Sequence, residues 1–175
     1  MGARRNARRH VKKRSWKAPW HLGSKEAVYD RVPSHIHGVA SSDMQAVLKS
    51  IRSMNRYIIR YQHDFGRIVG KSRCVATELG DEIIYARRVG RNSRSRFVLN
   101  RDAEPTSKVS VVLVKRADGR GYRILTAYYG TLMPVEPWDM GSDASDGSKE
   151  LWRSHAFVYD PREVVQNTIE YETPS

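Results

Sequence analysis

Apolar residues recur at spacings of three and four between Asp43 and Gln62, which is the pattern of a helix with one apolar face. Ser42 followed three residues later by Gln45 fits a capping box at the start of this helix, and Gly66 lies shortly beyond its end. The sequence therefore predicts one amphipathic helix over this range. Its apolar stripe consists of Met44, Val47, Leu48, Ile51, Met54, Ile58 and Tyr61.

Several shorter segments beyond the helix are rich in β-branched and aromatic residues and predict strands. Glu82 to Ala86 fits either a strand or a helical turn, and we favour a strand. The stretch from Met133 to Lys149 is rich in Pro, Gly, Ser and Asp, which predicts a long surface loop. The strand segments are Arg73 to Thr77, Asp81 to Val89, Ser95 to Asn100 and His155 to Tyr159, with Trp152 shortly before the last.

The clearest strand signal is a hairpin between Lys108 and Tyr129. Two runs rich in Val, Ile, Leu and Tyr flank a turn at Asp118-Gly119, and an Asp-Gly pair between such runs is a strong hairpin signal. Thr126 and Tyr128 lie near the end of the second strand, two residues apart, so both point to the same face.

These elements predict an α+β fold, with an N-terminal helix packed on one face of a four- to five-stranded, mostly antiparallel sheet. The other face of the sheet is then available for function. We divide the chain into a basic arm at residues 1–40, an α+β domain at 41–160 and a C-terminal tail at 161–175. The arm shows no sustained periodicity and is expected to be disordered or to wrap onto the domain.

The charge changes this picture, because it is concentrated in the arm. Of 31 Lys and Arg residues, nine lie within residues 1–25, which contain no Asp or Glu, whereas the rest of the chain has 22 basic and 19 acidic residues. Such an arm favours a polyanion through counterion release. A solvated tail and a transit peptide are the alternatives, the second disfavoured by the scarcity of serine. No apolar run approaches the ~18 residues that span a membrane.

Two kinds of site are disfavoured by the residues present. His21, His35 and His37 could be written as metal ligands, but no regular element places them and no carboxylate cluster accompanies them, so we expect no metal or other cofactor. Gly66 and Gly70 only loosely resemble a P-loop, because one residue is missing and no buried strand precedes them. A single cysteine excludes an internal disulfide and a Cys-rich zinc site.

A metal-free ribonuclease fits the remaining residues better. Attack by the RNA 2′-OH needs a general base, a general acid and cations around the phosphorus. Histidine suits the first two tasks and arginine or lysine the third. His63, expected at the helix end, and His155 are the candidate acid and base; a helix-terminal histidine and a half-buried sheet residue are the simpler interpretations of the same two positions. Arg67, Lys71 and Arg73 follow His63 closely, and Thr126 and Tyr128 add hydrogen-bond donors.

A second basic run is interleaved with Gly, Asn and Ser between residues 87 and 96. Such runs are usually solvated surfaces. Here the small polar residues favour a mobile basic loop that contacts RNA backbone. Its candidate RNA-binding residues, with Arg73, are Arg87, Arg88, Arg91, Arg94 and Arg96.

The order of these motifs resembles the barnase, EndoU, colicin and RelE superfamily of small metal-free ribonucleases, in particular phage and polymorphic-toxin nuclease domains. The similarity covers roughly residues 43–159: His63, a basic residue after it, DEIIYARR, SRFVL and the closing strand ILTAYYG. The resemblance implies His63 as the acid/base residue, Arg67 or Lys71 as the phosphate clamp and Thr126 as a hydrogen-bond donor supported by Tyr128. Tyr129-Gly130 stands where a proline is common, and the segments around Trp138 and Trp152 are additions.

The sequence thus predicts a metal-independent endoribonuclease toxin that cleaves tRNA or ribosome-associated RNA, with an immunity protein or antitoxin as a further partner. It would act in the cytoplasm, either of its own cell or of a cell into which it is delivered. The alternatives are a non-catalytic RNA- or ribosome-binding protein, whose arm follows the phosphate backbone, and a phage or DNA-associated structural protein.

Overall fold

The computed structural model describes residues 29–30, 36–52, 56–119, 121–138 and 145–172. Most of the predicted basic arm therefore lies outside the described residues. The described chain is α+β, with two helices and strands that pair mostly antiparallel in several sheets. Among these residues no helix is long and apolar enough to cross a membrane.

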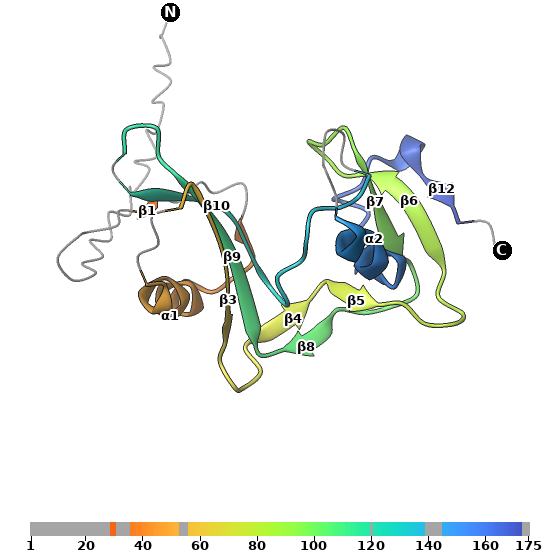
Figure 1. Cartoon of the computed structure of the whole chain (residues 1–175). Helices are drawn as coiled ribbons and strands as arrows, with labels where there is room; N and C mark the ends of the chain where they lie inside the picture. The colour runs from red at the N-terminus through yellow and green to blue at the C-terminus, as the bar shows by residue number, and fades with distance from the viewer. Residues whose placement is uncertain (1–28, 31–35, 53–55, 120, 139–144, 173–175) are drawn as a thin grey trace, which may run out of the picture.

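The first sheet is built around the predicted hairpin, which is confirmed. β9 (Lys108–Lys115) and β10 (Tyr122–Tyr129) pair antiparallel across the turn. β3 (Ile58–Asp64) adds antiparallel to β9, while β1 (Tyr29–Asp30) and β2 (Ile36–His37) both add parallel to β10. Helix α1 (Ser41–Ser50) covers one face of this sheet (Figure 1). Their shared core contains Val47, Leu48, Ile59, Val109, Val111, Leu113 and Ile124.

The helix starts near the predicted residue, but the prediction for its second half is wrong. The chain leaves α1 after Ser50, and Ile51 is already extended. Residues of the predicted stripe then continue into β3, where Ile58 and Tyr61 point to opposite faces because side chains alternate in a strand. Two adjacent β-branched residues and complete pairing of β3 with β9 outweigh the helical pattern.

The start of α1 is held by the sheet instead of by a capping box. Its N-cap is Ala40, whose methyl side chain can neither donate nor accept a hydrogen bond. The Ala40 N–H donates to the Tyr129 hydroxyl oxygen at 3.0 Å, and that hydroxyl donates to Asp43 Oδ2 at 2.8 Å. A tyrosine at the end of β10 therefore fixes the entry of the helix, which satisfies a terminal backbone donor.

The second sheet has the order β12-β6-β7-β11-β5 and its own apolar core. The weakly patterned segment around Ile83 and Ile84 is a strand, as favoured from the sequence. The chain's late residues complete this sheet, because β12 pairs with β6 and buried Val164 bridges to Arg88. Its strands are β5 (Cys74–Ala76), β6 (Ile83–Arg87), β7 (Arg94–Val98), β11 (His155–Val158) and β12 (Glu170–Tyr171), with the short η2 helix (Gln166–Thr168) before β12.

Part of the segment predicted as a surface loop is helical. Helix α2 (Asp146–Arg153) begins after Ser145, whose hydroxyl accepts a hydrogen bond from the Ser148 N–H. This is an N-cap of the common serine type. The helix carries Trp152 into the interior next to the second sheet.

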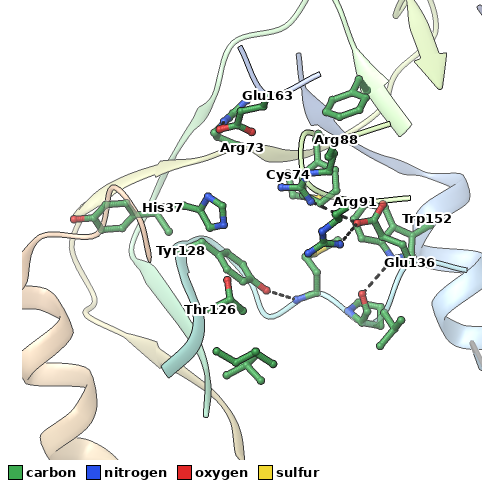
Figure 2. A pocket seen from close by; sticks show the side chains of 18 of the residues that line it. His37, Arg73, Cys74, Arg88, Arg91, Thr126, Tyr128, Glu136, Trp152 and Glu163 are labelled. Atoms are coloured by element: carbon green, nitrogen blue, oxygen red, sulfur yellow. Dashed lines mark hydrogen bonds and ion pairs between the residues drawn. The ribbon is translucent and has the colours of Figure 1, made fainter. Parts of the chain in front are cut away.

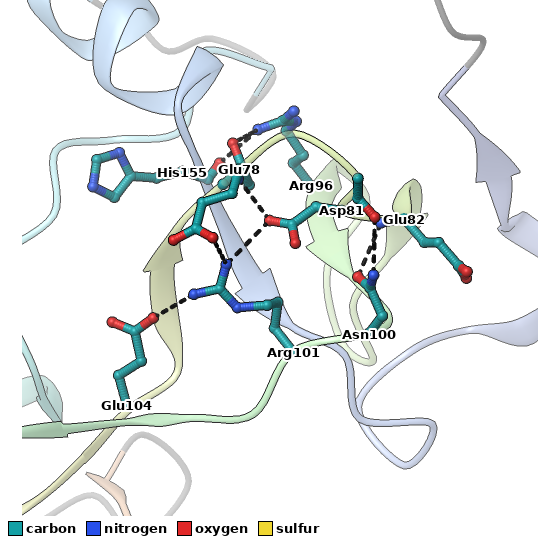
Figure 3. A network of polar contacts seen from close by, with 10 residues as sticks. Glu78, Asp81, Glu82, Arg96, Asn100, Arg101, Glu104 and His155 are labelled. Atoms are coloured by element: carbon teal, nitrogen blue, oxygen red, sulfur yellow. Dashed lines mark hydrogen bonds and ion pairs between the residues drawn. The ribbon is translucent and has the colours of Figure 1, made fainter.

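A two-stranded ribbon of β4 (Gly70–Ser72) and β8 (Glu104–Thr106) lies between the two sheets (Figure 1). At its far end the Arg101 guanidinium contacts three carboxylates, donating to Glu104 at 2.8 Å and lying 3.4 and 3.5 Å from Glu78 and Asp81 (Figure 3). Short segments connect the two sheets, and the contacts of Arg101 hold one of these segments in place. A cleft lined by side chains lies between the sheets.

The ribbon meets β10 at a position where only glycine fits. A Cβ on Gly70 would lie 2.5 Å from Cγ and Cδ1 of the Tyr129 ring, whose hydroxyl is held by α1. We expect Gly70→Ala to lower the free energy of unfolding by about 1–3 kcal/mol, because the ring has to move. Gly147→Ala is the control, since a Cβ there meets nothing within 4 Å and alanine favours the helix. Urea titrations that give both variants the same stability would contradict the expectation.

Candidate functional site

A cleft of about 400 Å³ opens between the two sheets. One wall is the face of the first sheet that is turned away from α1, and the other is formed by the second sheet, α2 and the segment from Met133 to Glu136 (Figure 2). Five cationic and two anionic side chains line it, so its net charge is positive. They are Arg60, Lys71, Arg73, Arg88, Arg91, Glu136 and Glu163.

A β-bulge in β10 supplies the polar part of the first wall. Ile124 pairs with Leu113, but Thr126 pairs with the next partner, Val112, so Leu125 is an extra residue. An extra residue reverses the alternation of the strand. Ile124 and Ala127 therefore enter the α1 core, whereas Thr126 and Tyr128 line the cleft. The prediction that these two hydroxyls share one face is confirmed.

The Tyr128 hydroxyl is held in this wall by a backbone donor. It accepts a hydrogen bond from the Met133 N–H at 2.9 Å, which leaves its own proton available for donation (Figure 2). Burial raises the pKa of Tyr128 above its usual value, an effect that the Met133 hydrogen bond partly offsets. The phenol therefore stays protonated around neutral pH and is able to donate a hydrogen bond.

His37 also lines the cleft. Its strand β2 pairs parallel with β10 so that His37 is directly in register with Tyr128. Partners in adjacent strands carry their side chains on the same face of a sheet, and both side chains are seen at the cleft in Figure 2. Among the described residues it is the histidine that the cleft contains. An imidazole, a phenol and an alcohol thus share one surface.

Two cations of the cleft have no partner among the residues that the structure describes. Arg60 on β3 and Lys71 on β4 are exposed and make no hydrogen bond or ion pair with any described residue. Burial raises the pKa of Tyr128, and the positive charge of Arg60 offsets a small part of that rise. These side chains can bind an anion without first breaking an internal contact.

The cations of the second wall are partly neutralised. The carboxylate of Glu136 lies 3.6 Å from the guanidinium groups of both Arg88 and Arg91, and it accepts a hydrogen bond from Trp138 Nε1 at 3.0 Å. Arg73 is bound to the Glu163 carboxylate and donates to the Val158 carbonyl at 3.0 Å. Arg73 thus connects Val158, at the end of β11, to Glu163 and has mainly a structural role.

Cys74 lines the cleft but is a poor nucleophile. Burial raises the pKa of its thiol to about 12. The reactive form of cysteine is the thiolate, which is scarce at physiological pH for such a thiol. No group of three or more His, Cys, Asp or Glu side chains in the described part of the chain is arranged to hold a metal ion.

The structure does not bring His63 into the cleft. His63 lies within β3, on the face shared by Ile59 and Tyr61, and its ring packs edge-on against Phe65 with centroids 4.6 Å apart. Arg67 lies over the same Phe65 ring at 6.0 Å. Of the predicted basic residues after His63, only Lys71 and Arg73 line the cleft.

His155 is likewise outside the cleft. Its Nδ1 lies 3.0 Å from the Leu151 carbonyl oxygen and 3.1 Å from the Ser154 hydroxyl, at the junction of α2 and β11. Its carbonyl oxygen accepts a hydrogen bond from Arg96 (Figure 3). These contacts describe a residue that connects a helix to a strand.

The predicted basic run is divided between the cleft and the body of the second sheet. Arg88 and Arg91 line the cleft, whereas Arg87, Arg94 and Arg96 do not. Arg94 pairs with Glu170, and buried Arg96 pairs with Glu172 at 3.1 Å, so both secure the last strand. The Arg87 N–H donates to Thr168 Oγ1 in the same region.

His37, Arg60 and Glu136 are among the cleft residues that the sequence did not predict as part of this site. His37 was considered only as a metal ligand, and its neighbours His21 and His35 lie outside the described residues. Arg60 was hidden inside the overextended helix, and Glu136 inside the predicted surface loop. The alternation of Ile59 and Tyr61 with polar neighbours was the signal that could have placed Arg60 on a strand.

Comparison of the chain with protein-family models, with curated proteins and with solved structures finds no match. The chemistry of the cleft is therefore the basis for assigning a function.

Proposed function

We propose that the protein is a metal-independent endoribonuclease whose active site is the cleft between the two sheets. The observation that carries the proposal is the register of His37 with Tyr128, which puts an imidazole next to two hydroxyls in a basic cleft. Imidazole is the side chain best suited to proton transfer near neutral pH. His37 replaces His63 in the role expected from the sequence.

Five of the cleft residues have roles in the proposed transesterification. His37 takes the proton from the 2′-OH, the 2′-oxygen forms a bond to phosphorus, and the bond to the 5′-oxygen breaks as that oxygen takes a proton from water. Lys71 and Arg60 stabilise the charge that develops on the phosphoryl oxygens. Thr126 and Tyr128 donate hydrogen bonds to the same oxygens. The products are a 2′,3′-cyclic phosphate and a 5′-OH.

The deciding experiment is incubation of the purified protein with total RNA in excess EDTA. We expect cleavage that leaves 5′-OH ends, with the matching DNA oligonucleotide and a 2′-deoxy-substituted RNA left intact, because the 2′-OH is the attacking group. RNA that remains whole between pH 5 and pH 9 would overturn the proposal. Tight, salt-sensitive binding without cleavage would instead identify a non-catalytic RNA-binding protein.

A further inference from the structure

Arg88 is the most unusual cation of the cleft, because it is largely buried yet has few partners. Its side chain is 17% exposed, and its guanidinium lies over the Phe157 ring at 4.6 Å from the centroid. Phe157 is itself fixed by Trp152 and Phe97, at centroid distances of 5.1 and 6.2 Å. A rigid aromatic cluster thus holds the plane of the guanidinium, an arrangement that arginine favours.

The hydrogen-bonding capacity of Arg88 is almost unused. A guanidinium has five N–H donors, but that of Arg88 makes no hydrogen bond with any described residue, and its ion pair with Glu136 is long at 3.6 Å. Glu136 is shared with Arg91 and accepts from Trp138. Burial lowers the pKa of Arg88, although an arginine remains charged at physiological pH. The donors of this largely buried cation are thus available to an anion that enters the cleft.

The position of Arg88 separates it from Arg60 and Lys71, the two cleft cations that have no partner among the described residues. Arg60 and Lys71 belong to the first sheet and its ribbon, whereas Arg88 follows β6 of the second sheet and is bridged to Val164. Both groups line the same cleft. An RNA strand bound there therefore meets cations on both walls, at two different places along its backbone.

We propose that Arg88 is a subsite for a second phosphate of the RNA chain, next to the phosphate that is held by Lys71 and Arg60. This inference rests on the proposed function for the identity of the polymer. It assigns a substrate class: single-stranded RNA with a phosphate flanking the cleaved linkage. The planar fork of Arg88 binds two oxygens of that phosphate, which is the geometry in which arginine recognises phosphate.

The test measures affinity for two non-cleavable ligands, a 2′-O-methyl dinucleoside monophosphate and the same molecule with an added terminal phosphate, placed at the 5′ end in one series and at the 3′ end in another. We expect the wild-type protein to bind one of the phosphorylated forms about tenfold more tightly. Arg88→Ala should abolish that preference and leave affinity for the unphosphorylated ligand within about twofold. No preference in the wild type, or a preference that survives in the variant, would overturn the proposal.

Two further variants make the result specific. Arg88→Lys keeps a cation beside Glu136, so it protects the fold, but it lacks the fork and should lose most of the preference. Arg116→Ala removes an equal charge from the β9–β10 turn, outside the cleft, and should keep the preference. Because this is a binding assay, a preference that depends on Arg88 in a protein that cleaves no RNA would sustain the subsite and refute the ribonuclease.

Discussion

Replacing His37 with alanine is expected to lower the rate of RNA cleavage by ~10² to 10⁴, which is the usual contribution of a general acid or base. The side chain is exposed and in register with Tyr128, so its loss removes a proton acceptor without opening a cavity. The measurement is kcat/KM on a single-stranded oligoribonucleotide across a range of pH. In the wild type, kcat/KM should rise with pH as the general base loses its proton, and this rise should be absent in the variant.

His63→Ala and His155→Ala are the matched controls. Both remove an imidazole, but His63 packs on Phe65 and His155 contacts the end of α2, each outside the cleft. We expect kcat/KM to stay within about twofold of wild type in both, once the folded fraction is confirmed by circular dichroism. A large loss in His63→Ala with full activity in His37→Ala would return the catalytic role to the residue expected from the sequence.

Replacing Trp152 with alanine is expected to produce the largest loss of stability, about 3–5 kcal/mol. Trp152 is only 1% exposed, packs against Phe157 at 5.1 Å and Trp138 at 6.0 Å, and donates through Nε1 to the Pro134 carbonyl at 3.3 Å. Alanine leaves a large cavity and an unpaired carbonyl in the wall of the cleft. Rigid neighbours of this kind collapse poorly into such a cavity.

Denaturant unfolding measures this effect, with Leu79→Ala as the control. Leu79 is a large apolar residue that is fully exposed, so its truncation should change the free energy of unfolding by less than about 0.5 kcal/mol. Similar losses in the two variants would show that Trp152 does not organise the second core.

The parts of the fold that depend on local patterns were predictable. The β9–β10 hairpin is specified by alternation and by Asp118-Gly119, where Gly119 has a φ of 71° that suits a tight turn. The start of α1 also follows from its apolar stripe. The end of α1 could not be predicted in this way, because β3 forms by pairing with β9, a strand that comes much later in the chain. Local periodicity does not contain that information.

The same distinction separates the predicted from the unpredicted site residues. Thr126 and Tyr128 are two residues apart in one strand, so their common face could be deduced. Lys71, which the sequence also proposed as a site residue, lines the same cleft. His37 enters the site through a two-residue parallel strand that has no recognisable pattern. The bulge at Leu125 was also hidden, because Leu is as acceptable in a regular strand as at an extra position.

The dependence of the second sheet on the last described residues has a consequence for synthesis. Arg73 and Arg88 reach their places through Glu163 and Val164, and β6 gains its outer neighbour only from Glu170 and Tyr171. A ribosome makes these partners after it has made the strands that depend on them. A growing chain consequently lacks a finished second wall until residues 163–171 have been synthesised. The strands β6 and β7 therefore wait, during synthesis, for neighbours that lie 60 or more residues later in the chain.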